Sequence, residues 1–154
     1  MTRAKSRSPS PLFETLYFQI GSAKREYAYG IEHAFPRRRP RLPTSESDSV
    51  LILGSIRHAF RQPITCCEIK LAGEDTFEAT SATVQRSIGF VDFVDETVRA
   101  YVWVPVQSLR RLASDLTQGQ FKEVSLRLID IKRRRALIDC INFESDLTPS
   151  EDFA

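Results

Sequence analysis

The part of this sequence with the clearest chemical meaning is a cluster of guanidinium groups in its first third. Four arginines fall within five positions, namely Arg37, Arg38, Arg39 and Arg41. Such a cluster could follow a phosphate backbone, because basic side chains attract phosphates and release the counterions condensed on them. The preceding aromatic residues Tyr27, Tyr29 and Phe35 could stack on bases. The same arginines also suit an acidic protein surface, and a solvated, proline-stiffened linker that binds nothing is the remaining alternative.

A second basic run follows near the end of the chain, where Lys132 precedes Arg133, Arg134 and Arg135. It lies between two predicted strands, so it is expected at a hairpin tip. Charges at such a tip keep the strands of different molecules from pairing. If the tip lay on the same side of the molecule as residues 37–41, the phosphate-binding interpretation would gain. Both basic runs are therefore candidates for binding a partner or a phosphate.

The residues able to perform hydrolysis do not assemble into a catalytic group. His33 and His58 are the two histidines, and Ser55 lies three residues before His58, a spacing that puts them on opposite faces of a strand. No third group is identifiable that would orient either histidine. Cys66, Cys67 and Cys140 give neither a disulfide framework nor a metal-ligand spacing. The sequence thus predicts no catalytic, cofactor-binding or metal-binding residue and favours a non-enzymatic protein.

Two further groups of residues have both a chemical and a structural interpretation. Asp92, Asp95 and Glu96 could bind a cation, but an ion pair or a solvated edge is the favoured alternative. If Asp92 is buried, Arg99 or Arg127 could be its partner. Tyr101 and Trp103 share one face of a predicted strand and could form a ligand platform. A lone tryptophan in a domain of this size more often packs in the core.

The elements that must position these residues are clearest between residues 98 and 143. Residues 98–104 alternate between Val or Ala on one face and Arg, Tyr or Trp on the other, which predicts a strand. Pro105 ends it, and an apolar stripe of period 3.6 predicts a helix over about residues 105–118, with Gly119 as its C-terminal cap. Residues 124–131 and 136–143 are predicted strands around the basic tip, with a bulge near Leu128 and Ile129.

The rest of the body also has the pattern of short strands. Residues 50–60 and 88–94 are predicted strands, and residues 64–71 are expected to form a hairpin with residues 76–84. This spacing predicts a mainly β (α+β) fold, an antiparallel β-sandwich or open barrel with one helix inserted between strands. We expect a disordered basic tail (1–11), an N-terminal arm and Pro/Arg-rich linker (12–48), a β-rich core domain (49–145) and an acidic C-terminal tail (146–154).

Charge is unevenly distributed along the chain. Residues 1–43 hold 9 Lys and Arg against 3 Asp and Glu, a balance of +6, whereas residues 44–154 hold 13 against 17, a balance of −4. No apolar run is long enough to span a bilayer, and the N-terminus has no apolar region of a secretory signal, so we expect a cytoplasmic protein without a membrane partner.

These observations support two functional hypotheses. The first is a non-enzymatic β-rich interaction or assembly module whose basic N-terminal arm docks on a protein partner or on a second subunit. Its main support is the arm itself, which carries more large apolar residues between Leu12 and Ile20 than a free tail needs. The alternative is nucleic-acid or nucleotide-phosphate binding through the arginine-rich segment 37–41.

Overall fold

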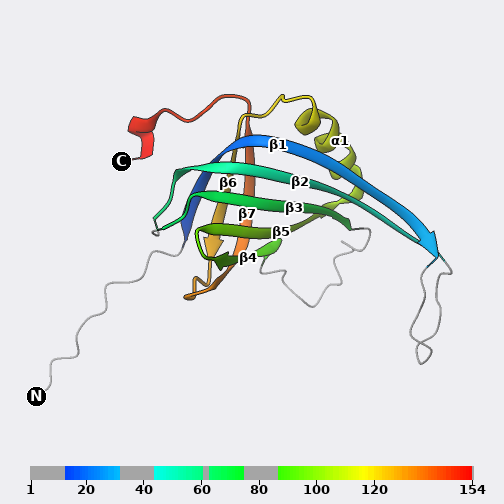
Figure 1. Cartoon of the computed structure of the whole chain (residues 1–154), viewed down its shortest axis with the longest axis horizontal. Coiled ribbons are helices and arrows are strands. Elements are labelled where there is room, and N and C mark those ends of the chain that lie inside the picture. Colours follow the sequence, from blue (N-terminus) through cyan, green and yellow to red (C-terminus); the bar gives the residue numbers. More distant parts are fainter. Residues whose placement is uncertain (1–12, 32–43, 61–62, 75–86, 154) are drawn as a thin grey trace, which may run out of the picture.

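A computed structural model describes residues 13–31, 44–60, 63–74 and 87–153 as a closed barrel of seven strands with one α-helix (Figure 1). The elements, in chain order, are β1 (Glu14–Ile31), β2 (Thr44–His58), β3 (Cys66–Glu74), β4 (Gly89–Val94), β5 (Thr97–Pro105), α1 (Val106–Thr117), β6 (Glu123–Ile129), β7 (Arg135–Glu144) and a final 3₁₀ turn, η1 (Ser150–Phe153). The mainly β fold with one inserted helix is confirmed.

The sheet closes on itself in the order β1-β2-β3-β5-β4-β7-β6, so it is neither a sandwich nor an open barrel as predicted. Closure depends on β1, because residues 14–19 pair with β6 while the strand also pairs with β2 along most of its length. Every neighbouring pair is antiparallel except β3 and β5, which run parallel. Closure pairs residues 14–19 of β1 with β6, so the barrel has fewer open strand edges than a sandwich would have kept.

The predicted hairpin between residues 64–71 and 76–84 does not form along β3. One edge of β3 pairs with β2 and the other with β5, so neither edge is open to a third strand. Residues 76–84 themselves lie outside the described part of the chain. The short turn-like sequence after Leu71 suggested a local hairpin, but β3 instead lies between β2 and the distant strand β5.

Alternation places the core inside the barrel as the sequence predicted. On β5 the side chains of Val98, Ala100, Val102 and Val104 are buried, while those between them point outward. The shift in register between Arg127 and Leu128 of β6 lies beside the predicted bulge. Phe18, Ile52 and Leu126 are among the fully buried residues, so the barrel is filled by side chains contributed from all around it.

Helix α1 covers part of this core with its apolar stripe. Leu109, Ala113 and Leu116 are buried, and the helix packs against β1, β2, β3 and β5. Pro105 is its N-terminal cap residue. Gly119 follows the helix with a φ of +74° and donates its N–H to the carbonyl oxygen of Leu116 at 3.2 Å. Of the helices in the described residues, none is long and apolar enough to cross a membrane.

The strands β1 and β2 extend beyond the rest of the barrel (Figure 1). β2 has β3 as a second neighbour only from Ser49 onward, and β1 has β6 only up to Gln19. Residues 27–31 and 44–48 therefore pair with each other alone, and we call this two-stranded part the ribbon. The boundary between arm and body that the sequence suggested near residue 49 thus falls inside β2, and β1 is a strand of the barrel.

Candidate interaction site

The arginine-rich segment predicted as the main binding site lies outside the described residues. Arg37, Arg38, Arg39 and Arg41 belong to residues 32–43, which join β1 to β2. The flanking residues Ile31 and Thr44 are paired at the end of the ribbon. The segment therefore connects the two strands at the tip of the ribbon. The sequence predicted it to be part of a linker.

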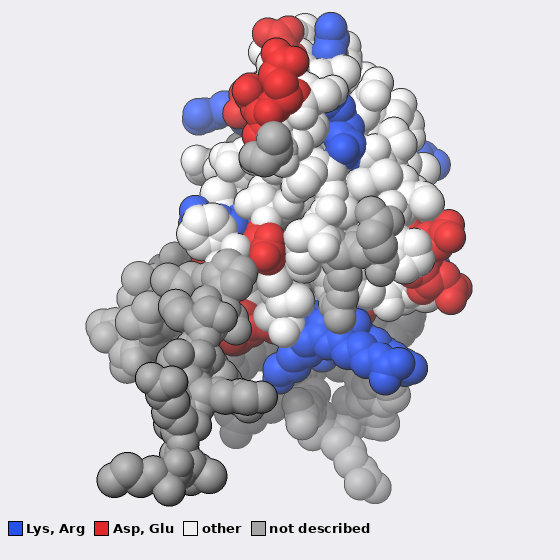
Figure 2. Space-filling model, turned by 90° about the vertical axis from the view of Figure 1, so that its left-hand side faces the viewer, with Lys and Arg blue, Asp and Glu red and all other residues white. Residues whose placement is uncertain are grey.

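The second basic run forms the tip between β6 and β7. Arg133, Arg134 and Arg135 are exposed, and Asp130 enters the turn with a φ of +48°. Figure 2 shows a patch of basic side chains toward the lower end of the molecule, where this turn lies in Figure 1, whereas acidic side chains occur at the top and at mid-height. The described parts of the chain provide no ion-pair partner for Arg133 or Arg134. These two guanidinium groups are available to an anionic partner.

The acidic residues considered as a cation site are used in other ways. Asp92 accepts a hydrogen bond from the Nε of Arg135 at 3.1 Å, rather than from the predicted Arg99 or Arg127. Arg127 instead pairs with Asp139 at 2.7 Å, and Asp95 occupies the turn between β4 and β5. Within the described ranges no group of three His, Cys, Asp or Glu residues could hold a metal ion.

An aromatic cluster lies on the outer face of the barrel, formed by Phe90, Tyr101 and Trp103. Tyr101 and Trp103 face outward because the alternate residues of β5 fill the core. The ring of Tyr101 lies 6.0 Å from that of Phe90 and 5.1 Å from that of Trp103. Lys70 and Arg135 lie over the rings of Tyr101 and Phe90, at 5.9 Å and 5.7 Å from their centroids. The favoured expectation of a core position for Trp103 is therefore wrong, and cations lie over two of the three rings that could form the alternative, a ligand platform.

A shallow hollow of about 260 Å³ lies where the ribbon leaves the barrel. Residues of β1, β2, β3 and β5 line it, among them Lys70 and Tyr101 of the aromatic cluster. Small-molecule sites generally enclose about 300–1,000 Å³. This hollow suits one side chain of a partner better than an enclosed ligand.

An ion pair fixes the ribbon at its base. The Nε and Nη2 of Arg25 donate to the two carboxylate oxygens of Asp48 at 3.0 and 2.7 Å. These hydrogen bonds lower the pKa of Asp48 and raise that of Arg25. A bidentate ion pair of this kind fixes both the distance between the two side chains and their relative orientation. It therefore holds the two strands in register where the barrel ends.

Beyond this ion pair the ribbon exposes two tyrosines on the face of the sheet that is buried within the barrel. On β2, Asp48 alternates with the buried Val50, so both point to the core side. Tyr27 is the cross-strand partner of Asp48, and Tyr29 follows two residues later on the same face. Tyr27 is 56% exposed and Tyr29 is 64% exposed. The core-facing stripe of the barrel thus continues onto an element that has no core beneath it in the described structure.

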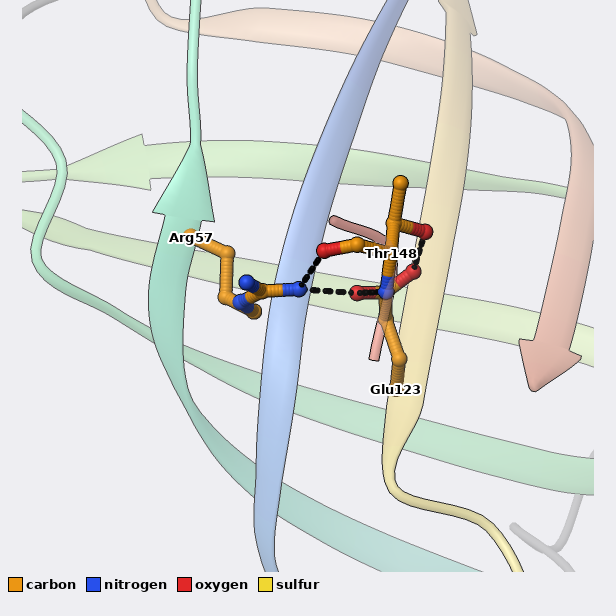
Figure 3. A network of polar contacts seen from close by, with 3 residues as sticks. All are labelled: Arg57, Glu123 and Thr148. Carbon is orange, nitrogen blue, oxygen red and sulfur yellow. Dashed lines mark hydrogen bonds and ion pairs between the residues drawn. The ribbon is translucent and has the colours of Figure 1, made fainter. Parts of the chain in front are cut away.

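The C-terminal segment docks on the outer face of the barrel through a buried carboxylate. Glu123 is only 1% exposed, and its Oε2 accepts hydrogen bonds from Arg57 Nη1 at 2.9 Å and from the Thr148 N–H at 3.0 Å. Its Oε1 accepts from the Thr148 hydroxyl at 2.5 Å, and Arg57 also donates to the Thr148 carbonyl oxygen. Figure 3 shows the guanidinium reaching from β2 across β1 toward the other two residues. Residues 146–153 of the predicted acidic C-terminal tail are therefore held against the barrel.

His58, one of the two histidines that the sequence offered for catalysis, lies at the end of β2 and contacts this docked segment. The ring of His58 stacks on Phe153 at 5.1 Å with an angle of 12° between the rings, and Tyr17 contacts the same Phe153 at 4.8 Å. Ser55 is exposed on β2, and His33 lies outside the described residues. No nucleophile, base and orienting group are brought together in the described part of the chain.

Comparisons with known proteins identify no relative, since no family model, curated protein or solved structure matches the chain. The function must therefore be argued from the contacts described above.

Sequence reasoning missed two of these features for different reasons. Tyr27 and Tyr29 were predicted only as aromatic residues that could stack on bases, because the face of the sheet that they occupy depends on the pairing of β1 with β2. The contact of Glu123 with Arg57 joins residues that are 66 positions apart, and no local pattern marks it. An isolated acidic residue just before the apolar alternation of β6 was the only available signal.

Proposed function

We propose that the chain is a non-enzymatic assembly module that docks on protein through its ribbon, with a second copy of the chain as the partner. The observation that carries this proposal is the exposure of Tyr27 and Tyr29 on the core-facing side of the ribbon. Tyrosine is enriched at protein interfaces because it combines a large apolar ring with a hydroxyl group that tolerates water.

Stability favours a partner for this element. A two-stranded ribbon is marginal in water, because ordering its backbone costs about 1–2 kcal/mol per residue and little surface is buried in return. A third strand or a facing surface would bury the two tyrosine rings. Each ring offers roughly 150–250 Å² at about 25 cal/mol per Å². The ribbon therefore gains much of its stability when a partner covers it.

The backbone of the ribbon supplies a route to that partner. From Gly21 to Ile31 the edge of β1 that faces away from β2 pairs with no other strand in the described structure. Such an edge accepts a strand from another chain through main-chain hydrogen bonds, while alternate side chains give specificity. Two copies that add β1 to β1 would form a symmetric dimer, the commonest arrangement of soluble oligomers.

Charge is consistent with a second copy as the partner. Residues 1–43 carry +6 and residues 44–154 carry −4, so the N-terminal part of one molecule is attracted to the remainder of another. The segment that holds Arg37, Arg38, Arg39 and Arg41 connects the two strands of the ribbon and contributes four of these positive charges. Electrostatic attraction of this kind speeds association and weakens as salt is added.

The test is the mass of the full chain and of a Tyr27→Ser/Tyr29→Ser variant by light scattering. We expect an assembly of two or more copies for the natural chain and a monomer for the variant. A matched control, Leu53→Ser/Val94→Ser, removes exposed apolar residues elsewhere on the barrel and should leave the mass unchanged. If the ribbon variant instead has the natural mass and a lower free energy of unfolding, the tyrosines pack within one chain and the proposal fails.

Nucleic-acid binding is the second candidate, and the aromatic cluster favours it. Phe90, Tyr101 and Trp103 offer ring faces beside Lys70 and Arg135, and Arg135 itself belongs to the basic tip. Stacking on aromatic side chains combined with cations is how many proteins hold single strands. This candidate predicts binding of a mixed-sequence oligonucleotide that weakens with salt, with a log–log slope of about −0.7 per phosphate neutralised. A Trp103→Ala/Arg134→Ala variant should bind more weakly, whereas the ribbon variant should bind normally.

A further inference from the structure

We infer that the outer face formed by Tyr17, Arg57, His58 and Glu123 is a peptide-binding site, which the chain's own C-terminal segment occupies. We call this group of residues the docking site. The peptide it takes has a hydroxyl residue and, five positions later, an aromatic ring. The inference is independent of the ribbon, because none of the four residues belongs to it.

The docking site recognises Thr148 through all of its polar groups. The backbone N–H and the hydroxyl of Thr148 both donate to the carboxylate of Glu123, and the carbonyl oxygen accepts from Arg57. A residue held by its donor, acceptor and side chain together is oriented as a peptide ligand is, since each contact constrains a different direction. The charges on both Arg57 and Glu123 strengthen these hydrogen bonds.

Phe153 supplies a second anchor at the end of the segment. Its ring packs against the rings of both His58 and Tyr17, which also contact each other at 6.2 Å, and the guanidinium of Arg57 lies 5.2 Å from its centroid. A ring held by two aromatic neighbours and a cation gains both stacking and cation–π attraction. The four residues between the two anchors are exposed, so two-point attachment holds the segment in place.

The carboxylate of Glu123 is what makes this a site rather than a chance contact. Its side chain lies on the outward parity of β6, because Val124, Leu126 and Leu128 fill the core, yet it is almost fully buried. In the described structure, this carboxylate accepts its hydrogen bonds from Arg57 and Thr148. Loss of the segment would leave Arg57 as its only direct partner, and a peptide that brings an N–H and a hydroxyl group would restore the missing donors.

The connection to the barrel allows the segment to exchange. Residues 144–147, which join β7 to Thr148, are all exposed and lie outside the strands after Glu144. A segment attached by such a link can leave and be replaced by a peptide of the same chemistry. The link keeps the effective concentration of the chain's own segment high, so a competing peptide binds well only after the link is cut.

The test uses the full chain with a protease recognition sequence inserted between Ser145 and Asp146. After folding, the chain is cleaved, the released segment is removed, and a fluorescent peptide of residues 144–154 is titrated by anisotropy. We expect binding to the cleaved protein and about tenfold or more weaker binding to the uncleaved protein, whose own segment competes. Peptides with Thr148→Ala or Phe153→Ala should bind about tenfold more weakly, because each loses one anchor.

Matched controls separate specific recognition from nonspecific binding of the peptide. A Ser150→Ala peptide changes an exposed position and should bind like the natural peptide. A Glu123→Gln protein keeps the side chain's size but not its charge, and should bind the natural peptide more weakly. The inference is overturned if the folded, cleaved barrel does not bind the peptide, or if both alanine peptides bind normally. It is also overturned if circular dichroism shows that the barrel unfolds once the segment leaves, because the segment is then part of the fold.

Discussion

Tyr27 lies directly opposite Asp48 across the β1–β2 ribbon, on the face that leads into the core through Val50 and Ile52. Asp48 is buried beside Arg25, whereas Tyr27 is 56% exposed. The core-facing stripe therefore changes from buried to exposed within one residue pair. An exposed continuation of a core face on a projecting element is the feature on which the assembly proposal rests.

Acid should weaken the base of the ribbon. Hydrogen bonds from Arg25 lower the pKa of Asp48 below its ordinary value of 3.8, so the unfolded chain takes up this proton more readily than the folded chain does. The stabilisation is fully present above pH 3.8 and is lost as the pH falls through the lower, folded pKa. An Asp48→Asn variant should therefore show a smaller loss of unfolding free energy between neutral pH and acid. Equal pH dependence in urea titrations of the two proteins would contradict this.

Gly89 should tolerate no side chain. A Cβ atom at this position would lie 2.0 Å from the carbonyl oxygen of Tyr101 and 2.9 Å from the Cα of Val102, both of which are backbone atoms. Gly89→Ala should lower the free energy of unfolding by about 3 kcal/mol, because forced overpacking displaces the β4–β5 pair. Gly30 has no atom within 4 Å of its Cβ position, so Gly30→Ala is the matched control and should be close to neutral. A folded Gly89→Ala protein of natural stability in urea would show that the two strands are farther apart.

Alkaline conditions should destabilise the fold through a buried thiol. Burial raises the pKa of Cys67 from 9.0 to about 12, so the unfolded chain loses this proton first. The stability is complete below pH 9.0 and declines as the pH rises toward about 12. The decline reaches at most about 1.4 kcal/mol per pH unit. A Cys67→Val variant should lose less stability over this range, and Cys67 should react with iodoacetamide more slowly than Cys66 or Cys140. Rapid alkylation of Cys67 in the folded protein would contradict its burial.

Removing the N-terminal quarter should abolish folding rather than release a separate domain. A chain of residues 44–154 lacks β1, so β2 and β6 lose their shared neighbour and the barrel opens. Leu16 and Phe18, which are fully buried, are lost with it. Far-ultraviolet circular dichroism should show little ordered sheet for this chain. A chain that lacks only residues 1–11 is the control and should keep the barrel, because β1 begins at Glu14. Cooperative unfolding of the 44–154 chain would show that β1 is dispensable.

The parts of the fold that could be predicted are those determined by neighbouring residues. The alternation of residues 98–104, the helical stripe after Pro105 and the glycine at position 119 each indicate one local conformation, and the structure has all three. The basic tip between β6 and β7 was likewise predictable, because two apolar alternations flank it. Local periodicity determines such elements regardless of what they pack against.

The parts that could not be predicted depend on pairing between distant residues. The prolines of residues 36–43 suggested a linker between an N-terminal arm and the body, yet Ile31 and Thr44, which flank residues 32–43, are paired in the sheet. β3 pairs in parallel with β5 and not with β4, the next strand in the chain, and no local pattern favours this pairing over a hairpin. The same holds for the candidate sites, since Tyr27 needs β2 to define its face and Glu123 needs Thr148 to reveal its role.

Amide hydrogen exchange in residues 24–31, followed by mass spectrometry at low and high concentrations of the full chain, tests the assembly proposal most directly. If β1 adds to a second copy, these amides should exchange more slowly as the concentration rises, because the open strand edge becomes hydrogen-bonded. The Tyr27→Ser/Tyr29→Ser variant should lose this dependence, and amides of β5 should show none in either protein. Exchange in residues 24–31 that is independent of concentration in the natural chain would contradict assembly through the ribbon.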